Sequence, residues 1–245
     1  MRSLGVIPVR MGSSRFPGKP LVPIHGIPMM DWVVGAAINA GLDEVVIATC
    51  DSEIVEHCKR RGFRTVMTSA EHQRASDRTA EAADVVEQHG GRQFDVVVMI
   101  QGDEPMVSSS MIRRANHALD GGITEVANLA GPILSQSEFE DPNCVKVVAS
   151  EDGRALLFSR SPVPWGALQQ GRAYRQVCVI PFRREALRDF IRLPPSSLEI
   201  AESIDMMRLI EHGRIVRIVR IEEVTYPVDT PDDLRRVEEL LPPRC

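Results

Sequence analysis

Three basic side chains, Arg10, Arg15 and Lys19, lie close together near the start of the chain, in the sequence VRMGSSRFPGK. Small residues at 12–14 allow backbone amides to approach a ligand closely, and arginine and lysine both bind phosphate oxygens. The pattern predicts an anion-binding loop, with a solvated basic turn as the alternative. The loop matches neither the P-loop pattern nor G-x-G-x-x-G, which disfavours kinase, ATPase and dehydrogenase sites.

Two acids are the candidates for a metal site. Asp103 lies in QGDEP, directly after the apolar run FDVVVMI. Acids at the end of a buried strand are costly unless a cation or a donor is near. Asp103 could hold Mg²⁺ beside a nucleotide phosphate, because magnesium prefers carboxylate and phosphate oxygens; a turn-forming acid is the alternative. Asp229, just before TPDD, is by itself more typical of a cap or a turn.

The first half of the chain must position these groups through alternating strands and helices. Apolar, β-branched runs predict strands and capped amphipathic runs predict helices. The strands are expected at 3–9, 43–51, 63–69 and 94–105, and the helices at 28–41, 52–62 and 76–91. This order predicts a Rossmann-like, three-layer α/β/α fold with a parallel sheet. Ligands bind such sheets beyond the carboxyl ends of the strands, where both candidate loops fall.

The second half has a different pattern. Strand-like runs occur at 124–133, 144–159 and 174–182, with a hairpin turn at Asp152-Gly153. Helices are expected at 196–213, capped by Ser196 or Ser197, and at 230–241, with Thr230 as N-cap and Pro231 in the first turn. No linker or internal repeat interrupts the chain. We expect one domain, 1–245, with an inserted mixed-sheet region at about 124–200.

Composition excludes several classes of function. The formal net charge of −5 argues against a general nucleic-acid binder. No apolar run reaches the roughly 18–20 residues that span a bilayer, and the N-terminal apolar stretch is too short for a signal peptide. The five cysteines lack C-x-x-C spacing, which favours reduced thiols over a zinc site or a disulfide frame. A cytoplasmic protein is expected.

Taken together, these segments resemble a known family. IPVRMGSSRFPGKPL, HQRASDR, QGDEP, DPNCVKVV, ALLFSRSPVPW and VDTPDDLRRV are similar, in order, to the CMP-Kdo synthetases, the 3-deoxy-manno-octulosonate cytidylyltransferases. The similarity spans nearly the whole chain. It implies a nucleotidyltransferase fold, a homodimer, and an enzyme that uses CTP and Mg²⁺ to transfer CMP to a small anionic acceptor acid with release of pyrophosphate.

The resemblance also implies roles for residues. Lys19, Arg15 and Asp103 are the expected catalytic residues, and Asp103 and Asp229 the expected metal ligands. The expected nucleotide-binding residues are Arg10, Gly12, Ser13, Arg15, Lys19, Arg74, Ala75 and Arg78. The expected acceptor-binding residues are Gln101, Arg160, Gln176, Glu199 and Glu202.

Two segments depart from the family's pattern. Arg74 and Ala75 replace a Ser-Gly pair in H-x-S-G-T-[DE]-R, which puts details of base recognition in doubt. In the acceptor strand, QVCVIPFR places Gln176, Ile180 and Phe182 at positions that usually carry His and Tyr. Lost hydrogen-bond partners disfavour a hydroxyl-rich sugar, at roughly 1–3 kcal/mol each, unless neighbouring groups compensate.

Three alternatives therefore stay open. The acceptor could be a phosphonate of the phosphonoformate type, whose attacking oxygen is already anionic. The nucleotide could be UTP or dTTP. A non-catalytic nucleotide-binding module is the third alternative, and the presence of Lys19, Asp103 and Asp229 disfavours it.

Overall fold

The chain folds as an α/β protein of two compact units. The computed structural model describes residues 1–12 and 15–243. The first unit joins Met1–Arg113 to Thr225–Cys245, and the second is Arg114–Val224. The second unit contains the whole of the mixed-sheet region predicted at about 124–200 and extends beyond it at both ends.

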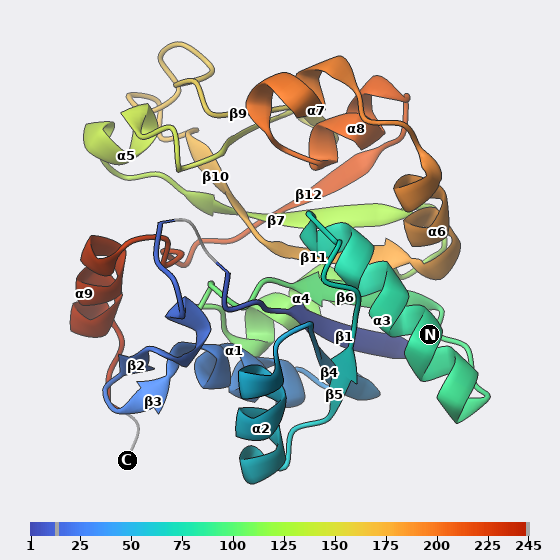
Figure 1. Cartoon of the computed structure of the whole chain (residues 1–245). Helices are drawn as coiled ribbons and strands as arrows, with labels where there is room; N and C mark the ends of the chain where they lie inside the picture. Colours follow the sequence, from blue (N-terminus) through green and yellow to red (C-terminus); the bar gives the residue numbers. More distant parts are fainter. Residues whose placement is uncertain (13–14, 244–245) are drawn as a thin grey trace. The chain divides into compact units, whose positions relative to one another are not determined.

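A parallel sheet forms the centre of the first unit (Figure 1). Its strands are β1 (Ser3–Pro8), β4 (Glu44–Thr49), β5 (Thr65–Met67) and β6 (Val96–Ile100), in the order β5-β4-β1-β6. Every residue of β1 and β6 is buried, which accounts for their largely apolar sequences. The four strands expected from the sequence are confirmed, and each is one to several residues shorter than its predicted range.

Helices pack on this sheet as the alternating pattern predicts. They are α1 (Met29–Ile38), α2 (Ser52–Arg61) and α3 (Ala75–Gly90). Helices α1 and α3 both contact β1 and β4, and α2 contacts β5. Helix α2 ends at Gly62, whose φ of 72° is a left-handed conformation that suits glycine. Helix α4 (Ser109–His117), which the sequence did not predict, contains the boundary between the units.

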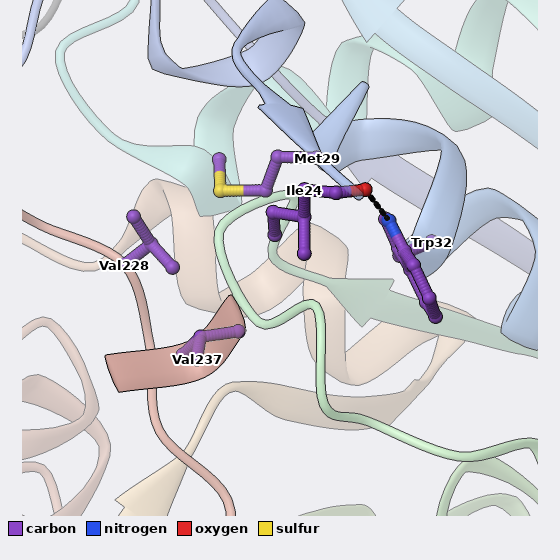
Figure 2. Close-up of a cluster of buried hydrophobic side chains, with 5 residues drawn as sticks. All are labelled: Ile24, Met29, Trp32, Val228 and Val237. Carbon is purple, nitrogen blue, oxygen red and sulfur yellow. Dashed lines mark hydrogen bonds between the residues drawn. The ribbon is translucent and has the colours of Figure 1, made fainter. Parts of the chain in front are cut away.

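The C-terminal segment joins the first unit through a small apolar core (Figure 2). After β1 the chain forms the short turn η1 (Lys19–Leu21) and a hairpin, β2 (Pro23–Ile24) with β3 (Ile27–Pro28). Helix α9 (Pro231–Leu240) packs against β2. The buried side chains of this core are Ile24, Met29, Trp32, Val228 and Val237. Each such side chain contributes about 1.5–3 kcal/mol by leaving water, so the core fixes the segment around Val228.

The second unit is built on a mixed sheet. Strand β7 (Val126–Pro132) pairs antiparallel with β10 (Tyr174–Val177) and β11 (Val179–Arg183), and parallel with β12 (Val216–Arg220). Strand β8 (Lys146–Ala149) pairs antiparallel with β10 and with β9 (Ala155–Ser159). Its helices are α5 (Gln136–Glu140), α6 (Arg184–Arg192), α7 (Ser197–Glu202) and α8 (Met206–Glu211).

Two elements expected in this unit are interrupted. The helix predicted at 196–213 is two helices, because Ser203 adopts a left-handed φ of 54° between α7 and α8. The strand predicted at 174–182 is divided at Cys178 into β10 and β11. None of the helices in the described part of the chain has both the length and the apolar character of a membrane-spanning segment.

Candidate functional site

The loop after β1 carries the predicted anion-binding residues. Beyond the strand, the Val9 amide still bonds to the carbonyl of Ala48, at 2.9 Å. Arg10, Gly12 and Arg15 are exposed, and a side chain at position 12 would meet no described atom within 4 Å. The loop thus leaves open space next to its backbone, as a close-fitting ligand requires. Ser13, also predicted here, lies outside the described residues.

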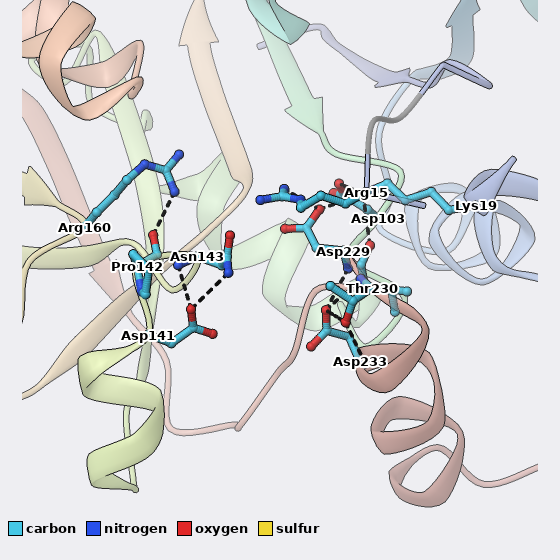
Figure 3. A network of polar contacts seen from close by, with 11 residues as sticks. Arg15, Lys19, Asp103, Asp141, Pro142, Asn143, Arg160, Asp229, Thr230 and Asp233 are labelled. Atoms are coloured by element: carbon cyan, nitrogen blue, oxygen red, sulfur yellow. Dashed lines mark hydrogen bonds and ion pairs between the residues drawn. The ribbon is translucent and has the colours of Figure 1, made fainter. Parts of the chain in front are cut away.

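Lys19 is the centre of the site (Figure 3). Gly18, with φ of 75°, turns the chain into η1, which Lys19 begins. The Lys19 ammonium donates to Asp103 Oδ2 at 2.7 Å, to the Val228 carbonyl at 2.9 Å and to Asp229 Oδ1 at 2.9 Å. Its three protons are therefore all engaged. The Lys19 side chain is only 12% exposed, so these charge-assisted bonds are shielded from water.

Asp103 and Asp229 come from segments far apart in the sequence. Asp103 follows β6, and Asp229 precedes α9. The Val228 amide donates to the Asp103 carbonyl at 2.9 Å, so a backbone bond holds the two segments together. Gly102 lets the segment after β6 pass close to the end of β1, because a Cβ there would lie 2.2 Å from Val9 Cγ1. The predicted convergence of Lys19, Asp103 and Asp229 is present in the first unit.

Asp229 is fixed by the start of helix α9. Asp233 Oδ2 accepts from the amides of Asp229 at 3.1 Å and Thr230 at 2.8 Å. Thr230 Oγ1 in turn accepts from the Asp233 amide at 3.2 Å, which completes a capping box. Asp233 is not among the residues predicted from the sequence, although T-x-x-D before an amphipathic run is the pattern of such a box.

The charges in this cluster stabilise one another. Arg15 Nη2 lies 3.0 Å from Asp229 Oδ1, the oxygen that Lys19 also contacts. Burial lowers the pKa of Lys19, but the charges of Asp103 and Asp229 outweigh it and raise the pKa above its ordinary value. Burial raises the pKa of Asp229, but the charges of Lys19 and Arg15 and their hydrogen bonds lower it overall. At neutral pH the site therefore holds an ammonium and a carboxylate.

The donor set suits a magnesium ion. Among the described residues no three acidic, His or Cys side chains form a metal cluster. Magnesium, however, is usually bound by one or two carboxylates together with substrate phosphates and water. Asp103 and Asp229 each direct one oxygen to the same Lys19 ammonium, so the two carboxylates are neighbours. That pair fits the ion.

Helix α3 presents the remaining nucleotide candidates. Arg74 is its N-cap and Ala75 its first residue. Arg78 is only 3% exposed, and its guanidinium donates to Thr68 Oγ1. Its Nη2 atom is buried without a hydrogen-bond partner among the described residues. A buried charged donor without a partner is costly, and a ligand oxygen would relieve that cost. Gln101, predicted on the acceptor side, is half-buried directly after β6.

In the second unit, Arg160 and Glu202 lie together (Figure 3 shows Arg160). Arg160 Nε donates to the Glu202 carbonyl at 2.7 Å, and the Arg160 amide to Glu202 Oε2 at 2.9 Å. Burial raises the pKa of Glu202, but the bonds from Arg160 and Ser159 lower it overall. Arg160 Nη1 donates to the Pro142 carbonyl at 2.8 Å, while Nη2 makes no hydrogen bond to any described residue. Arg160 thus keeps donors for a ligand.

The other two acceptor candidates have partners inside the second unit. Gln176 is 9% exposed, and its Nε2 donates to Asn128 Oδ1 at 2.6 Å. Glu199 has no exposed surface, and its carboxylate receives two bonds from Arg208, at 2.7 and 2.8 Å. Glu199 also accepts from the Ser196 amide at the start of α7. These contacts give Glu199 a structural role.

The altered acceptor strand contributes core residues. Ile180 is 1% exposed and Phe182 is fully buried. Phe182 stacks on Phe190 of α6, with ring centroids 5.8 Å apart. The apolar side chains at these two positions therefore fill the interior of the second unit, which weakens the prediction that they disfavour a hydroxyl-rich sugar.

Comparison with known proteins identifies the family of the chain. A family model described as cytidylyltransferase matches residues 4–221. A 3-deoxy-manno-octulosonate cytidylyltransferase of Syntrophobacter fumaroxidans is 40% identical, over 98% of this chain and 97% of the relative. The protein of the same name from Azorhizobium caulinodans is 39% identical, over 97% and 95%.

A solved structure is similar over nearly the same extent. It is described as CMP:2-keto-3-deoxy-manno-octonic acid synthetase complexed with CTP. Its TM-score is 0.87 and its identity 35%, and the match covers 98% of both chains. The predicted nucleotidyltransferase fold is thereby confirmed. These relatives do not favour the phosphonate alternative, since their names specify the octulosonate acceptor.

Proposed function

Because this chain belongs to the cytidylyltransferase family and is a CTP-dependent nucleotidyltransferase, we propose that it transfers CMP from CTP to 3-deoxy-manno-octulosonate. The observation that carries the proposal is the cluster in which Lys19, at the end of a basic loop, contacts Asp103 and Asp229. Full-length similarity to enzymes named for that acceptor supports it.

The transfer is one substitution at phosphorus. An oxygen of the acceptor acid bonds to the α-phosphorus of CTP as the bond from that phosphorus to the bridging oxygen breaks, and pyrophosphate leaves. The acceptor's hydroxyl proton passes to solvent. Such a reaction depends on positioning and on neutralising charge rather than on a covalent enzyme intermediate.

The basic loop holds the triphosphate in this proposal. Arg15, whose side chain is 49% exposed, and the exposed Arg10 bind phosphate oxygens. Lys19 offsets charge that develops on the leaving pyrophosphate. Because its three protons already have acceptors, each new phosphate contact must replace one of the present bonds. Lys19 therefore stabilises the leaving pyrophosphate mainly through its positive charge, and the number of its hydrogen bonds changes little.

Asp103 and Asp229 hold Mg²⁺ in the working enzyme. When bound, the ion neutralises phosphate charge and polarises the α-phosphate. The two carboxylates bind the ion, Lys19 balances their charge in its absence, and Asp233 fixes the backbone of Asp229 through two hydrogen bonds.

The acceptor's carboxylate binds to Arg160. Two contacts to backbone carbonyls hold the Arg160 guanidinium in place. Its Nη2 has no hydrogen bond to a described residue, and arginine pairs well with carboxylates. Glu202 Oε2 accepts a hydrogen bond from the Arg160 amide and so fixes the backbone of Arg160. We further propose that the enzyme is cytoplasmic and that it is a homodimer; light scattering of the purified protein would test the homodimer.

Pyrophosphate release tests the function directly. The purified protein is given CTP and Mg²⁺ with 3-deoxy-manno-octulosonate, with phosphonoformate or with no acceptor, and the octulosonate reactions are repeated with UTP and dTTP. We expect release only with CTP and the octulosonate. Turnover with phosphonoformate alone would overturn the acceptor assignment. A folded protein that turns over no pair would contradict the proposed function, and so would preference for UTP.

A further inference from the structure

Asp51 occupies the N-cap position of helix α2 but does not cap the helix. An aspartate at this position usually accepts hydrogen bonds from amides of the first helical turn. Here the Asp51 side chain makes no such bond. Asp51 Oδ2 instead accepts from the backbone amide of Met11, at 2.8 Å, in the loop that follows β1. The carboxylate thus contacts the loop in place of its own helix.

The pairing of β1 with β4 places Asp51 opposite Met11. In the parallel register, Leu4 faces Glu44 and Pro8 faces Ala48. The same offset beyond the carboxyl ends of the strands aligns Met11 with Asp51. The Asp51 amide donates to Thr49 Oγ1 at 3.1 Å, and Thr49 is fully buried. The Asp51 carboxylate therefore projects from a fixed backbone.

Met11 passes this constraint to the catalytic lysine. Its amide is held by Asp51, and its carbonyl accepts from the Gly18 amide at 3.0 Å. Gly18 is the residue that turns the chain into η1, directly before Lys19. The bond between Met11 and Gly18 closes the base of the basic loop, and Asp51 ties that base to the sheet.

We propose that Asp51 is a positioning residue for nucleotide binding: it fixes the base of the loop so that Arg10, Arg15 and Lys19 meet the triphosphate in a set arrangement. This inference rests on the proposed function of the loop. Asp51 acts through the oxygen that accepts the hydrogen bond from Met11 and not through its negative charge, because a carboxylate near the loop repels an anionic ligand. Ordering the loop before CTP arrives lowers the entropy lost on binding.

Two substitutions distinguish the hydrogen bond that Asp51 accepts from the negative charge of its carboxylate. Asp51→Ala removes the hydrogen bond to Met11, and Asp51→Asn keeps an acceptor oxygen and a good N-cap residue. We expect Asp51→Ala to raise the Kd for CTP about tenfold, which corresponds to the loss of one ordinary hydrogen bond of about 1.4 kcal/mol. Asp51→Asn should bind CTP within about twofold of the wild type. Titration calorimetry measures both, and amide exchange at Met11 and Gly18 in the free protein reports loop opening.

Asp43 offers a matched control at the other end of the same strands. Asp43 Oδ2 accepts from the Ser3 amide at 2.8 Å, across the same β1–β4 pair and with the same sequence offset. Asp43→Ala should lower the melting temperature without changing CTP affinity or the exchange rates at Met11 and Gly18.

Three results would decide against the inference. One is CTP binding by Asp51→Ala within twofold of the wild type. Another is an equal loss of affinity in Asp43→Ala, which would indicate general weakening of the sheet. The third is an Asp51→Asn variant as defective as Asp51→Ala. Wild-type protein that binds no CTP would instead overturn the proposed function, while exchange at Met11 would still report whether Asp51 orders the loop.

Discussion

Replacing Lys19 by methionine removes an ammonium that three oxygens share while keeping an unbranched side chain of similar length. The Val228 carbonyl and the Asp103 and Asp229 carboxylates lose their common donor. The two carboxylates are then neighbours without the cation between them. We expect both the rate of CMP transfer and the free energy of unfolding to fall.

The magnitudes follow from the burial of the cluster. Removing one preorganised charge that stabilises a transition state costs about 3–4 kcal/mol, or a factor of about 10²–10³ in kcat. Asp103 and Asp229 are 23% and 21% exposed, so water screens part of their repulsion. We therefore expect unfolding to become easier by about 1–3 kcal/mol, less than for a fully buried pair.

Two measurements test this reasoning. Steady-state kinetics with saturating CTP and acceptor acid give the change in kcat, and denaturant unfolding gives the change in stability. Added Mg²⁺ should restore stability to Lys19→Met more than to wild type, because the ion replaces the missing cation. Lys59→Met, on the exposed surface of α2, is the control and should change stability by less than about 0.5 kcal/mol. A folded Lys19→Met protein with kcat within threefold of wild type would refute the assignment.

Other consequences can be checked separately. The hydrogen bond from the Ser3 amide is the main cause that holds the pKa of Asp43 below its ordinary value of 3.8. The stability that this carboxylate adds is therefore present above that pH and is lost as the pH falls through the lower pKa of the folded state. In thermal melts, Asp43→Asn should be less stable than the wild type at pH 7 and equal to it in strong acid. Burial raises the pKa of the Cys144 thiol to about 12, so mass mapping should find it unalkylated at pH 8 in folded protein and alkylated after denaturation. Glu199→Gln breaks the buried ion pair with Arg208 and should lower the free energy of unfolding by about 3–5 kcal/mol. The KM for the acceptor acid should stay within twofold of the wild type. A large rise in that KM at normal stability would show instead that Glu199 binds the acceptor acid.

The sequence was sufficient where local chemistry decides the structure. Continuous apolar runs predicted β1 and β6 because both are buried on their two faces. The start of α9 was predicted at Thr230 with Pro231 in the first turn, because capping depends on neighbouring residues alone. Family motifs then supplied the roles of the basic loop, which no local pattern determines.

Local pattern failed where tertiary packing overrides it. Helix α6 is an exception that was simply missed, because buried Leu187 and Phe190 lie three residues apart in REALRDFIR, as in an amphipathic helix. The helix from 196 to 213 breaks at Ser203, whose left-handed conformation no propensity indicates. In the acceptor strand, the types of Ile180 and Phe182 were visible, but only the fold showed that both lie in the core.

The site itself divides in the same way. Residue types and their spacing were enough to place a basic loop and isolated acids at strand ends, because both are local properties. Only the folded structure shows that Lys19 donates a hydrogen bond to Asp229, 210 positions away. It also shows that Asp51 accepts from the Met11 amide and not from an amide of its own helix. Such contacts depend on strand register and on the packing of α9, which form only when distant apolar segments are buried together.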